Sequence, residues 1–221
     1  MGNSVNKTVS TGGGSAGAIK SECEELKDDV EKADEQVQND IREGSATPGS
    51  AKRKLSAHKA STVSSSKATC GGKTTRKPAY SSLKRLPTSA RKKYAQGTAG
   101  GASNMCKKPN GRKFKHTPSN GRSSCNHTEG RFIEDLFKDN GKEGRVTSCS
   151  LTMKIKWKQR KLVKDAKGKV LRVLGKPPLD KPCPRCEKTI CHAMSCGMKI
   201  FLCKTENGQE KKREPDFCKK S

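Results

Sequence analysis

The chain has 221 residues, a formal net charge of +26 at pH 7 and only 29% hydrophobic residues. Compact domains usually contain nearer half apolar residues, so this composition predicts one small folded region in a mostly disordered chain. No apolar run approaches the roughly 18 residues of a membrane span, and the N-terminus lacks the hydrophobic segment of a secretory signal. The eleven cysteines are therefore expected in a reducing compartment, as thiols or metal ligands rather than disulfides.

Residues 1–20 have the pattern of a flexible lipid-anchor segment. After removal of Met1, the start Gly2-Asn3-Ser4-Val5-Asn6-Lys7 resembles an acceptor for N-myristoylation on Gly2, with Asn6 where the strict motif has Ser or Thr. A single myristoyl chain binds bilayers only marginally, so stable attachment needs a second signal such as a polybasic segment. The alternative is an unmodified, disordered N-terminus.

Residues 21–43 are the only acidic segment and predict an amphipathic helix. Ser21 and Glu24 form a capping box, and Gly44 is placed to end the helix. Apolar residues recur every three or four positions and share one helical face: Leu26, Val30, Ala33, Val37 and Ile41. Three surroundings remain open for this helix: self-association with a second copy as a short coiled coil, contact with the chain's own basic tract, or solvent alone.

Residues 44–128 form a polybasic tract with 19 Lys and Arg and no Asp or Glu. Small and polar residues fill most of the other positions, so the tract buries too little apolar surface to fold and is expected to be disordered. A flexible cation of this length needs an anionic partner, such as a membrane surface, a nucleic acid or an acidic polymer. The candidate binding residues are Lys52, Arg53, Lys54, Arg76, Lys77, Lys84, Arg85, Arg91, Lys92, Lys93, Lys107, Lys108, Arg112, Lys113 and Lys115.

Apart from the helix predicted at 21–43, signals for ordered structure are confined to residues 129–221. Residues 131–137 predict a short amphipathic helix, and residues 149–157 alternate between apolar and polar side chains, as in a strand with one buried face. Two further strands are expected at 169–174 and 198–203. The fold class predicted for this part is a small, basic, antiparallel β region with a cysteine-rich end.

The cysteine-rich end contains a candidate zinc site. The motif Cys183-Pro184-Arg185-Cys186 is a CxxC pair, and this spacing allows two thiolates to bind one tetrahedral ion. Cys191 or the adjacent His192, together with Cys196, would complete four ligands. The second pair is spaced differently from that of a zinc ribbon, and the alternative is that these residues are free thiols packed as small hydrophobic side chains.

The sequence shows no nucleophile elbow, phosphate-binding loop or HExxH pair, so an enzyme is not expected. Three binding functions fit the composition. The first is a lipid-anchored protein at the cytoplasmic face of the plasma membrane that holds an anionic polymer such as actin. The second is a nuclear protein that binds nucleic acid or chromatin through its Lys and Arg residues. The third is a zinc-dependent interaction module with a disordered tail. The Met1-Gly2 start favours the first.

The Met1-Gly2-Asn3-Ser4 start, the chain length and the extreme basic balance together resemble the nullo family, small basic proteins of fly-embryo cellularization. The resemblance implies a developmental protein that is myristoylated on Gly2 and lies at the advancing membrane front, its furrows and cell junctions. It further implies that the protein stabilises the actin–myosin network while furrows form. Of the family's functional positions, only Gly2 is carried over to this chain.

Overall fold

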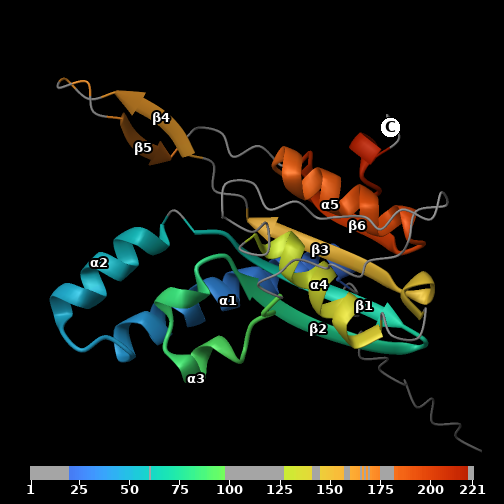
Figure 1. Cartoon of the computed structure of the whole chain (residues 1–221), viewed down its shortest axis with the longest axis horizontal. Coiled ribbons are helices and arrows are strands. Elements are labelled where there is room, and N and C mark those ends of the chain that lie inside the picture. The colour runs from blue at the N-terminus through green and yellow to red at the C-terminus, as the bar shows by residue number, and fades with distance from the viewer. Residues whose placement is uncertain are drawn as a thin grey trace, which may run out of the picture.

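The computed structural model describes residues 20–59, 61–97, 127–140, 145–156, 160–164, 166, 168, 170–174 and 182–218. Five strands form a mixed sheet in the order β2-β1-β3-β6-β7 (Figure 1). They are β1 (Val63–Cys70), β2 (Lys73–Tyr80), β3 (Ser150–Lys156), β6 (Lys199–Glu206) and β7 (Gln209–Arg213). The expected fold class, a mostly disordered chain, is therefore wrong, because the described residues form a mixed α/β fold.

Helices cover both faces of this sheet. Helix α1 (Glu22–Glu43) contacts β1, β3 and β7, and α2 (Pro48–His58) packs against α1. Helices α4 (Thr128–Asn140) and α5 (Pro184–Ser195) contact each other on the opposite face, with α4 next to β1 and β2 and α5 next to β6. Figure 1 shows α4 in front of the strands and α1 behind them. The sheet is thus the middle of three layers.

The main core lies between the sheet and helices α4 and α5. Every second residue of β3 points into it, namely Leu151, Met153 and Ile155. The helices contribute Phe132, Ile133 and Phe137 from α4 and Ile190 and Ala193 from α5. A second cluster under α1 contains Val30, Val37, Ile41, Tyr80, Leu86 and Tyr94. These two clusters hold α4 and α5 side by side and fix the sheet against α1.

Helix α1 confirms the helix predicted at 21–43. The Ser21 hydroxyl accepts a hydrogen bond from the backbone N–H of Glu24 (3.3 Å), and the Glu24 carboxylate accepts one from the backbone N–H of Ser21 (2.8 Å). These reciprocal bonds satisfy N–H groups that have no partner inside the helix. The predicted apolar face, including Leu26 and Val37, is buried against the sheet side of the molecule.

We expect Ser21→Ala to lower the free energy of unfolding by about 1 kcal/mol, because it removes the side-chain acceptor at the start of α1. Urea unfolding of the full chain measures this change. Ser56→Ala is a matched control, since Ser56 is an exposed serine within α2 and surface changes of this kind usually stay within about 0.5 kcal/mol. Equal unfolding midpoints for the two variants would contradict the capping role of Ser21.

The acidic side chains of α1 bind cations from the rest of the chain. Arg76 of β2 contacts both Glu25 (3.1 Å) and Asp29 (2.7 Å), and Lys212 of β7 pairs with Glu22 (2.7 Å). Two further pairs are Lys156–Asp34 and Lys93–Asp40. Exposed pairs of this kind stabilise little one by one, but together they match the acidic helix to the basic strands. The sequence leaves three surroundings open for this helix, and in the structure α1 contacts basic residues of its own chain.

Residues 44–59 and 61–97 of the polybasic tract are ordered, which contradicts the expected disorder. They contain α2, β1 and β2, followed by the short helices η1 (Leu83–Arg85) and α3 (Thr88–Arg91). Strand β1 buries Val63 and three consecutive serines, Ser64, Ser65 and Ser66. This polar strand is buried because α1 covers one side of it and α4 the other. Amino-acid composition therefore underestimates how much of this tract is folded, because small hydroxyl side chains fill the space between the sheet and its covering helices.

Strands β3 and β6 fall where strands are predicted at 149–157 and 198–203, but their pairing differs from the expected antiparallel sheet. They run parallel, with Leu151 opposite Ile200. A parallel pair needs a crossover connection, and α5, for which the sequence predicts no helix, lies in that connection. Strand β5 (Val170–Leu174) pairs with β4 (Arg160–Lys164) in a separate two-stranded hairpin.

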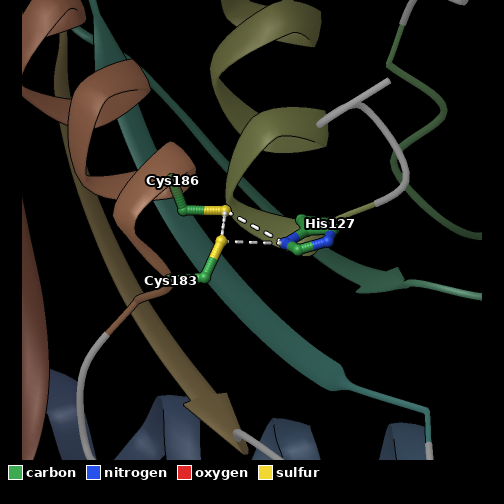
Figure 2. A group of neighbouring side chains, drawn as sticks. All are labelled: His127, Cys183 and Cys186. Atoms are coloured by element: carbon green, nitrogen blue, oxygen red, sulfur yellow. Dashed lines mark hydrogen bonds between the residues drawn. The ribbon is translucent and has the colours of Figure 1, made fainter. Parts of the chain in front are cut away.

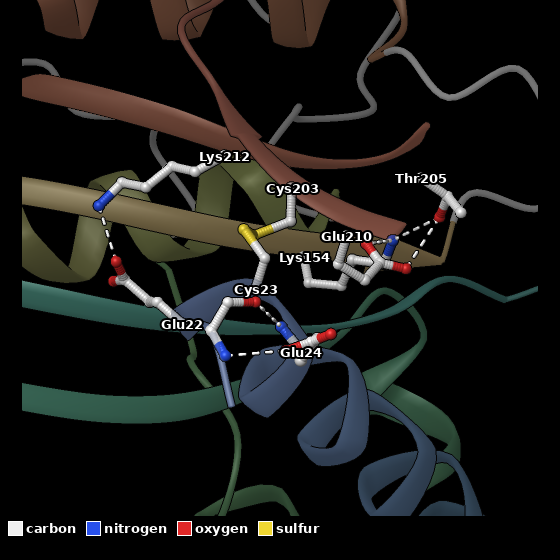
Figure 3. Close-up of a disulfide and its surroundings, with 9 residues drawn as sticks. Glu22, Cys23, Glu24, Lys154, Cys203, Thr205, Glu210 and Lys212 are labelled. Carbon is white, nitrogen blue, oxygen red and sulfur yellow. Dashed lines mark hydrogen bonds and ion pairs between the residues drawn. A yellow bond between two sulfur atoms is a disulfide. The ribbon is translucent and has the colours of Figure 1, made fainter. Parts of the chain in front are cut away.

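Disulfides link distant parts of the described chain. The pairs are Cys23–Cys203, Cys70–Cys149 and Cys191–Cys218, and Cys196 is also disulfide-bonded. The expectation that the cysteines are thiols or metal ligands is therefore wrong for these residues. Figure 3 shows how Cys23, at the start of α1, is bonded to Cys203 of β6, next to the Lys212–Glu22 ion pair. The acidic helix is thus covalently attached to the sheet.

Candidate metal centre

Two helix N-termini meet at one end of the α4 and α5 layer. Cys183 is the N-cap of α5, Pro184 occupies its first turn, and Cys186 follows within that turn. Proline suits this position because its fixed φ angle is helical and its missing N–H would have no partner there. His127 immediately precedes α4 and accepts the first helical hydrogen bond on its carbonyl oxygen, from the N–H of Arg131. Figure 2 shows the side chains of His127, Cys183 and Cys186 pointing toward one another.

The three potential ligand atoms lie at nearly equal distances from one another. The Sγ atoms of Cys183 and Cys186 are 3.5 Å apart, and Nδ1 of His127 is 3.5 Å from Cys183 Sγ and 3.2 Å from Cys186 Sγ. Ligands of one tetrahedral zinc ion are about 3.8 Å apart for two sulfurs and about 3.6 Å apart for sulfur and nitrogen, given the usual bond lengths. The observed separations are only slightly shorter, so the group has the size of a zinc site.

The electrostatics of the group favour a thiolate before any metal binds. The hydrogen bond between the Cys183 and Cys186 side chains lowers the pKa of Cys183 to about 3, helped by the hydrogen bond with His127 and opposed by burial. The same Cys183 hydrogen bond and burial raise the pKa of Cys186. Interaction with Cys183 also raises the pKa of His127, against the effect of burial. Because thiolate is the metal-binding form of cysteine, the low pKa of Cys183 favours binding of a cation.

A buried carboxylate borders this group. Glu129 follows His127 by two residues, in the first turn of α4, and is only 2% exposed. Its Oε2 accepts a hydrogen bond from the Thr128 hydroxyl (3.3 Å), and its charge and hydrogen bonding contribute to the raised pKa of Cys186. No other Cys, His, Asp or Glu of the described residues joins the three-ligand group. The centre thus combines three ligands with a carboxylate that is close to them but outside the ligand group.

The predicted zinc ligands divide into two pairs. The structure brings Cys183 and Cys186 together as expected. Cys191 instead forms a disulfide with Cys218 (Cα–Cα 5.1 Å), and Cys196 is disulfide-bonded as well, so neither can complete the centre. His127, which lies at the end of the 44–128 tract, takes part in their place. The sequence does contain a signal for His127: a His-x-Glu segment that is followed later in the chain by Pro-Cys-x-x-Cys.

The predicted polyanion-binding residues are spread over the described molecule rather than gathered at the metal centre. Arg85 donates a hydrogen bond to the Ala57 carbonyl oxygen (2.9 Å), and Lys77 pairs with Asp135 (3.2 Å). Exposed members include Lys52, Arg53, Lys84 and Lys92. Gly2, Lys107, Lys108, Arg112, Lys113 and Lys115 lie outside the described residues. No helix of the described part has both the length and the apolar character to cross a membrane.

Comparisons with protein-family models, with curated proteins and with solved structures find no match for this chain. The function is therefore inferred from the chemistry of the candidate metal centre itself. That chemistry has three elements: a cation-binding triad of one imidazole and two thiols, an adjacent buried carboxylate, and the fixed order of these residues along the chain.

Proposed function

We propose that this chain is a zinc-dependent hydrolytic deaminase that acts on the amino group of a nucleobase. One observation carries the proposal: His127 and Glu129 precede Pro182-Cys183-x-x-Cys186 in the sequence, and the ligand atoms of His127, Cys183 and Cys186 lie within 4.8 Å of one another. A His-x-Glu pair followed by Pro-Cys-x-x-Cys is the zinc-binding arrangement used by nucleobase deaminases. The proposal replaces the expectation that the chain is not an enzyme.

In this proposal the residues have separate tasks. Cys183, Cys186 and His127 hold the ion, and three protein ligands are the number that leaves a position open for water. When bound, zinc supplies positive charge and lowers the pKa of such a water to near neutrality. Glu129 accepts a proton from the water as its oxygen bonds to the ring carbon that carries the amino group. Glu129 would pass one of the water's protons to the adjacent ring nitrogen and the other to the amino group, whose bond to the ring carbon breaks, so one water is consumed, one ammonia is released and the ring gains an oxo group.

The pair Cys183 and Cys186 also suits thiol–disulfide exchange, because the pKa of Cys183 is about 3 and the second sulfur is 3.5 Å away. Glu129 favours the hydrolytic function over this one. The Glu129 carboxylate raises the pKa of Cys186 and has no task in exchange, whereas a hydrolytic deaminase requires it. Oxidoreductase activity is therefore the second candidate.

The lipid-anchored, actin-binding interpretation stays a separate prediction. Gly2 lies outside the described residues, so the structure carries no observation on its acylation or on the nullo resemblance. The disulfides of the described residues favour folding in an oxidising compartment, where cysteine pairs persist, rather than at the cytoplasmic face of a membrane. We accordingly base the proposed function on the metal centre.

The proposal is tested by metal analysis and by ammonia release. Full-length protein folded with zinc is expected to bind one equivalent of metal and to release ammonia from cytosine- or adenine-containing substrates, supplied as free nucleosides and as single-stranded oligonucleotides. Mass spectrometry of the product identifies the exchange of an amino group for an oxo group. Removing the metal with a chelator should stop the reaction, because the water then loses its activation.

Cys186→Ser is expected to abolish both zinc binding and ammonia release, whereas the doubly substituted Cys191→Ala/Cys218→Ala protein should retain both, since that disulfide lies outside the ligand group. Protein that holds a full equivalent of zinc and releases no ammonia from any of these substrates would exclude the deaminase function. Reduction of an insulin disulfide by the zinc-free protein would instead support thiol–disulfide exchange.

A further inference from the structure

A separate β-hairpin precedes the cysteines of the metal centre in the chain. Strands β4 and β5, which we call the basic arm, lie between the end of β3 and Cys183, in the connection that leads to α5. The basic arm pairs with itself in antiparallel register, for example Leu162 with Arg172, and does not join the five-stranded sheet. Figure 1 shows it extending away from the sheet and its covering helices. Its backbone therefore presents an extended ribbon on the connection that carries the site.

The sequence of the basic arm is strongly cationic. Its ten strand residues contain four basic residues and no acidic one: Arg160, Lys161, Lys164 and Arg172. Two further basic residues, Arg185 and Lys188, are exposed on the first turns of α5, next to Cys183 and Cys186. The centre is thus flanked by positive charge on the element before it in the chain and on the helix that carries it.

Glu187 lies between Arg185 and Lys188 in α5, whereas several other acidic residues of the fold are paired away from the centre. Glu22, Glu25 and Asp29 on α1 pair with cations of β2 and β7 on the opposite face of the sheet, and Asp135 of α4 pairs with Lys77. Because these pairs are neutral, the excess of +26 for the whole chain remains to be balanced by an external anion. A free nucleoside carries no phosphate and would gain nothing from such a surface, whereas a nucleic acid brings one charge per nucleotide.

We propose that the nucleobase acted on by this centre belongs to a single-stranded nucleic acid, and that the basic arm with the start of α5 binds its phosphates. The inference rests on the proposed deaminase function and names its substrate class. Enzymes that modify a base in a polymer work on single strands or extrude the base, so contacts to the flanking backbone determine where the base is presented. In this proposal the basic arm, which precedes α5 in the chain, supplies those contacts, and the centre holds one base.

The test uses full-length Glu129→Gln protein, which can bind substrate without consuming it, and a fluorescent mixed-sequence oligonucleotide, as single-stranded DNA and as RNA. An arm variant changes Arg160, Lys161, Lys164 and Arg172 to Gln. A matched control changes to Gln four exposed basic residues that are not among the predicted polyanion-binding residues, namely Lys27, Lys32, Arg42 and Lys199. If all four arm cations contact phosphates, the slope of log K against log salt for the arm variant should fall by about 3.

The same substitutions in active protein are compared by kcat/KM on an oligonucleotide and on the free nucleoside. The expected result is that the ratio of the two falls at least tenfold for the arm variant and stays unchanged for the control. An equal loss in both variants would overturn the role of the arm. A nucleoside processed as efficiently as the oligonucleotide, with no dependence on the arm, would overturn the substrate class while leaving the deaminase function intact. Absence of ammonia from every substrate would overturn the deaminase function, and the substrate inference with it. Comparison of kcat/KM on DNA and RNA oligonucleotides identifies whether the preferred substrate contains deoxyribose or ribose.

Discussion

Glu129→Gln is expected to lower kcat for ammonia release by about 10²–10⁴-fold, the usual contribution of a well-placed general acid–base group. Glutamine has nearly the same shape but cannot take up and return a proton, so both the activation of water and the departure of the amine lose their proton carrier. Zinc should remain bound, because Glu129 is not in the three-ligand group. The measurement is the steady-state rate of ammonia release at equal zinc content.

The control for this substitution is Glu31→Gln, which removes an exposed carboxylate from α1 on the opposite face of the sheet and is expected to leave kcat unchanged. The result distinguishes catalysis from stability, since both proteins can be checked for folding and metal content before the assay. Zinc-loaded Glu129→Gln protein with full activity would show that another group carries the proton. A variant that loses zinc along with activity would assign Glu129 to metal binding instead.

Half of the metal centre is predictable from sequence because it is local. Cys183 and Cys186 are three residues apart, and a helix that begins there places both thiols on its first turn. Cys191 looks equally close in sequence, but five residues further along a helix it is turned by about 140° and displaced by about 7.5 Å from Cys186. It therefore faces Cys218 and forms a disulfide. Closeness in sequence therefore does not predict which cysteines share a site when they lie more than one turn apart on the same helix.

The other half is not predictable from spacing, because the fold alone brings it into place. His127 is 56 residues from Cys183 and reaches it only because α4 and α5 pack together on one face of the sheet. The sequence predicts a helix at 131–137, whereas α4 starts at Thr128, and this earlier start places His127 and Glu129 at its N-terminal end. The triplet His127-Thr128-Glu129 is short and has meaning only in combination with the cysteines.

The polybasic tract shows a different kind of failure. Disorder is predicted for 44–128 because its apolar residues are few, yet Val63 and Tyr80 are fully buried and the serines of β1 are buried with them. The compensating residues lie elsewhere in the chain: α1 supplies carboxylates for Arg76 and an apolar face for Tyr80. Composition within one segment cannot reveal a partner that comes from another segment. The acidic helix and the basic strands predict each other only when considered together.

The double substitution Cys23→Ala/Cys203→Ala is expected to have the largest effect on stability among the disulfide variants. The two cysteines are 180 residues apart, and the Cys70–Cys149 bond, which spans 79 of those residues, shortens the effective loop. A loop of at most about 100 residues corresponds to a loss of up to about 4.7 kcal/mol in the free energy of unfolding, through the entropy of the unfolded chain. Urea unfolding of the oxidised protein measures this loss.

Cys191→Ala/Cys218→Ala is the matched control, because it removes a disulfide that spans only 27 residues. Chain entropy predicts a loss of about 3.5 kcal/mol for that loop, so the two double variants should differ by about 1 kcal/mol. The Cys23–Cys203 bond also fastens the acidic helix over the basic strands, where Glu22 and Lys212 meet (Figure 3). Its removal should therefore allow α1 to detach before the sheet unfolds, seen as earlier hydrogen exchange in 22–43 than in β3. If α1 and β3 exchange together and the two variants are equally stable, the disulfide contributes nothing beyond a local crosslink.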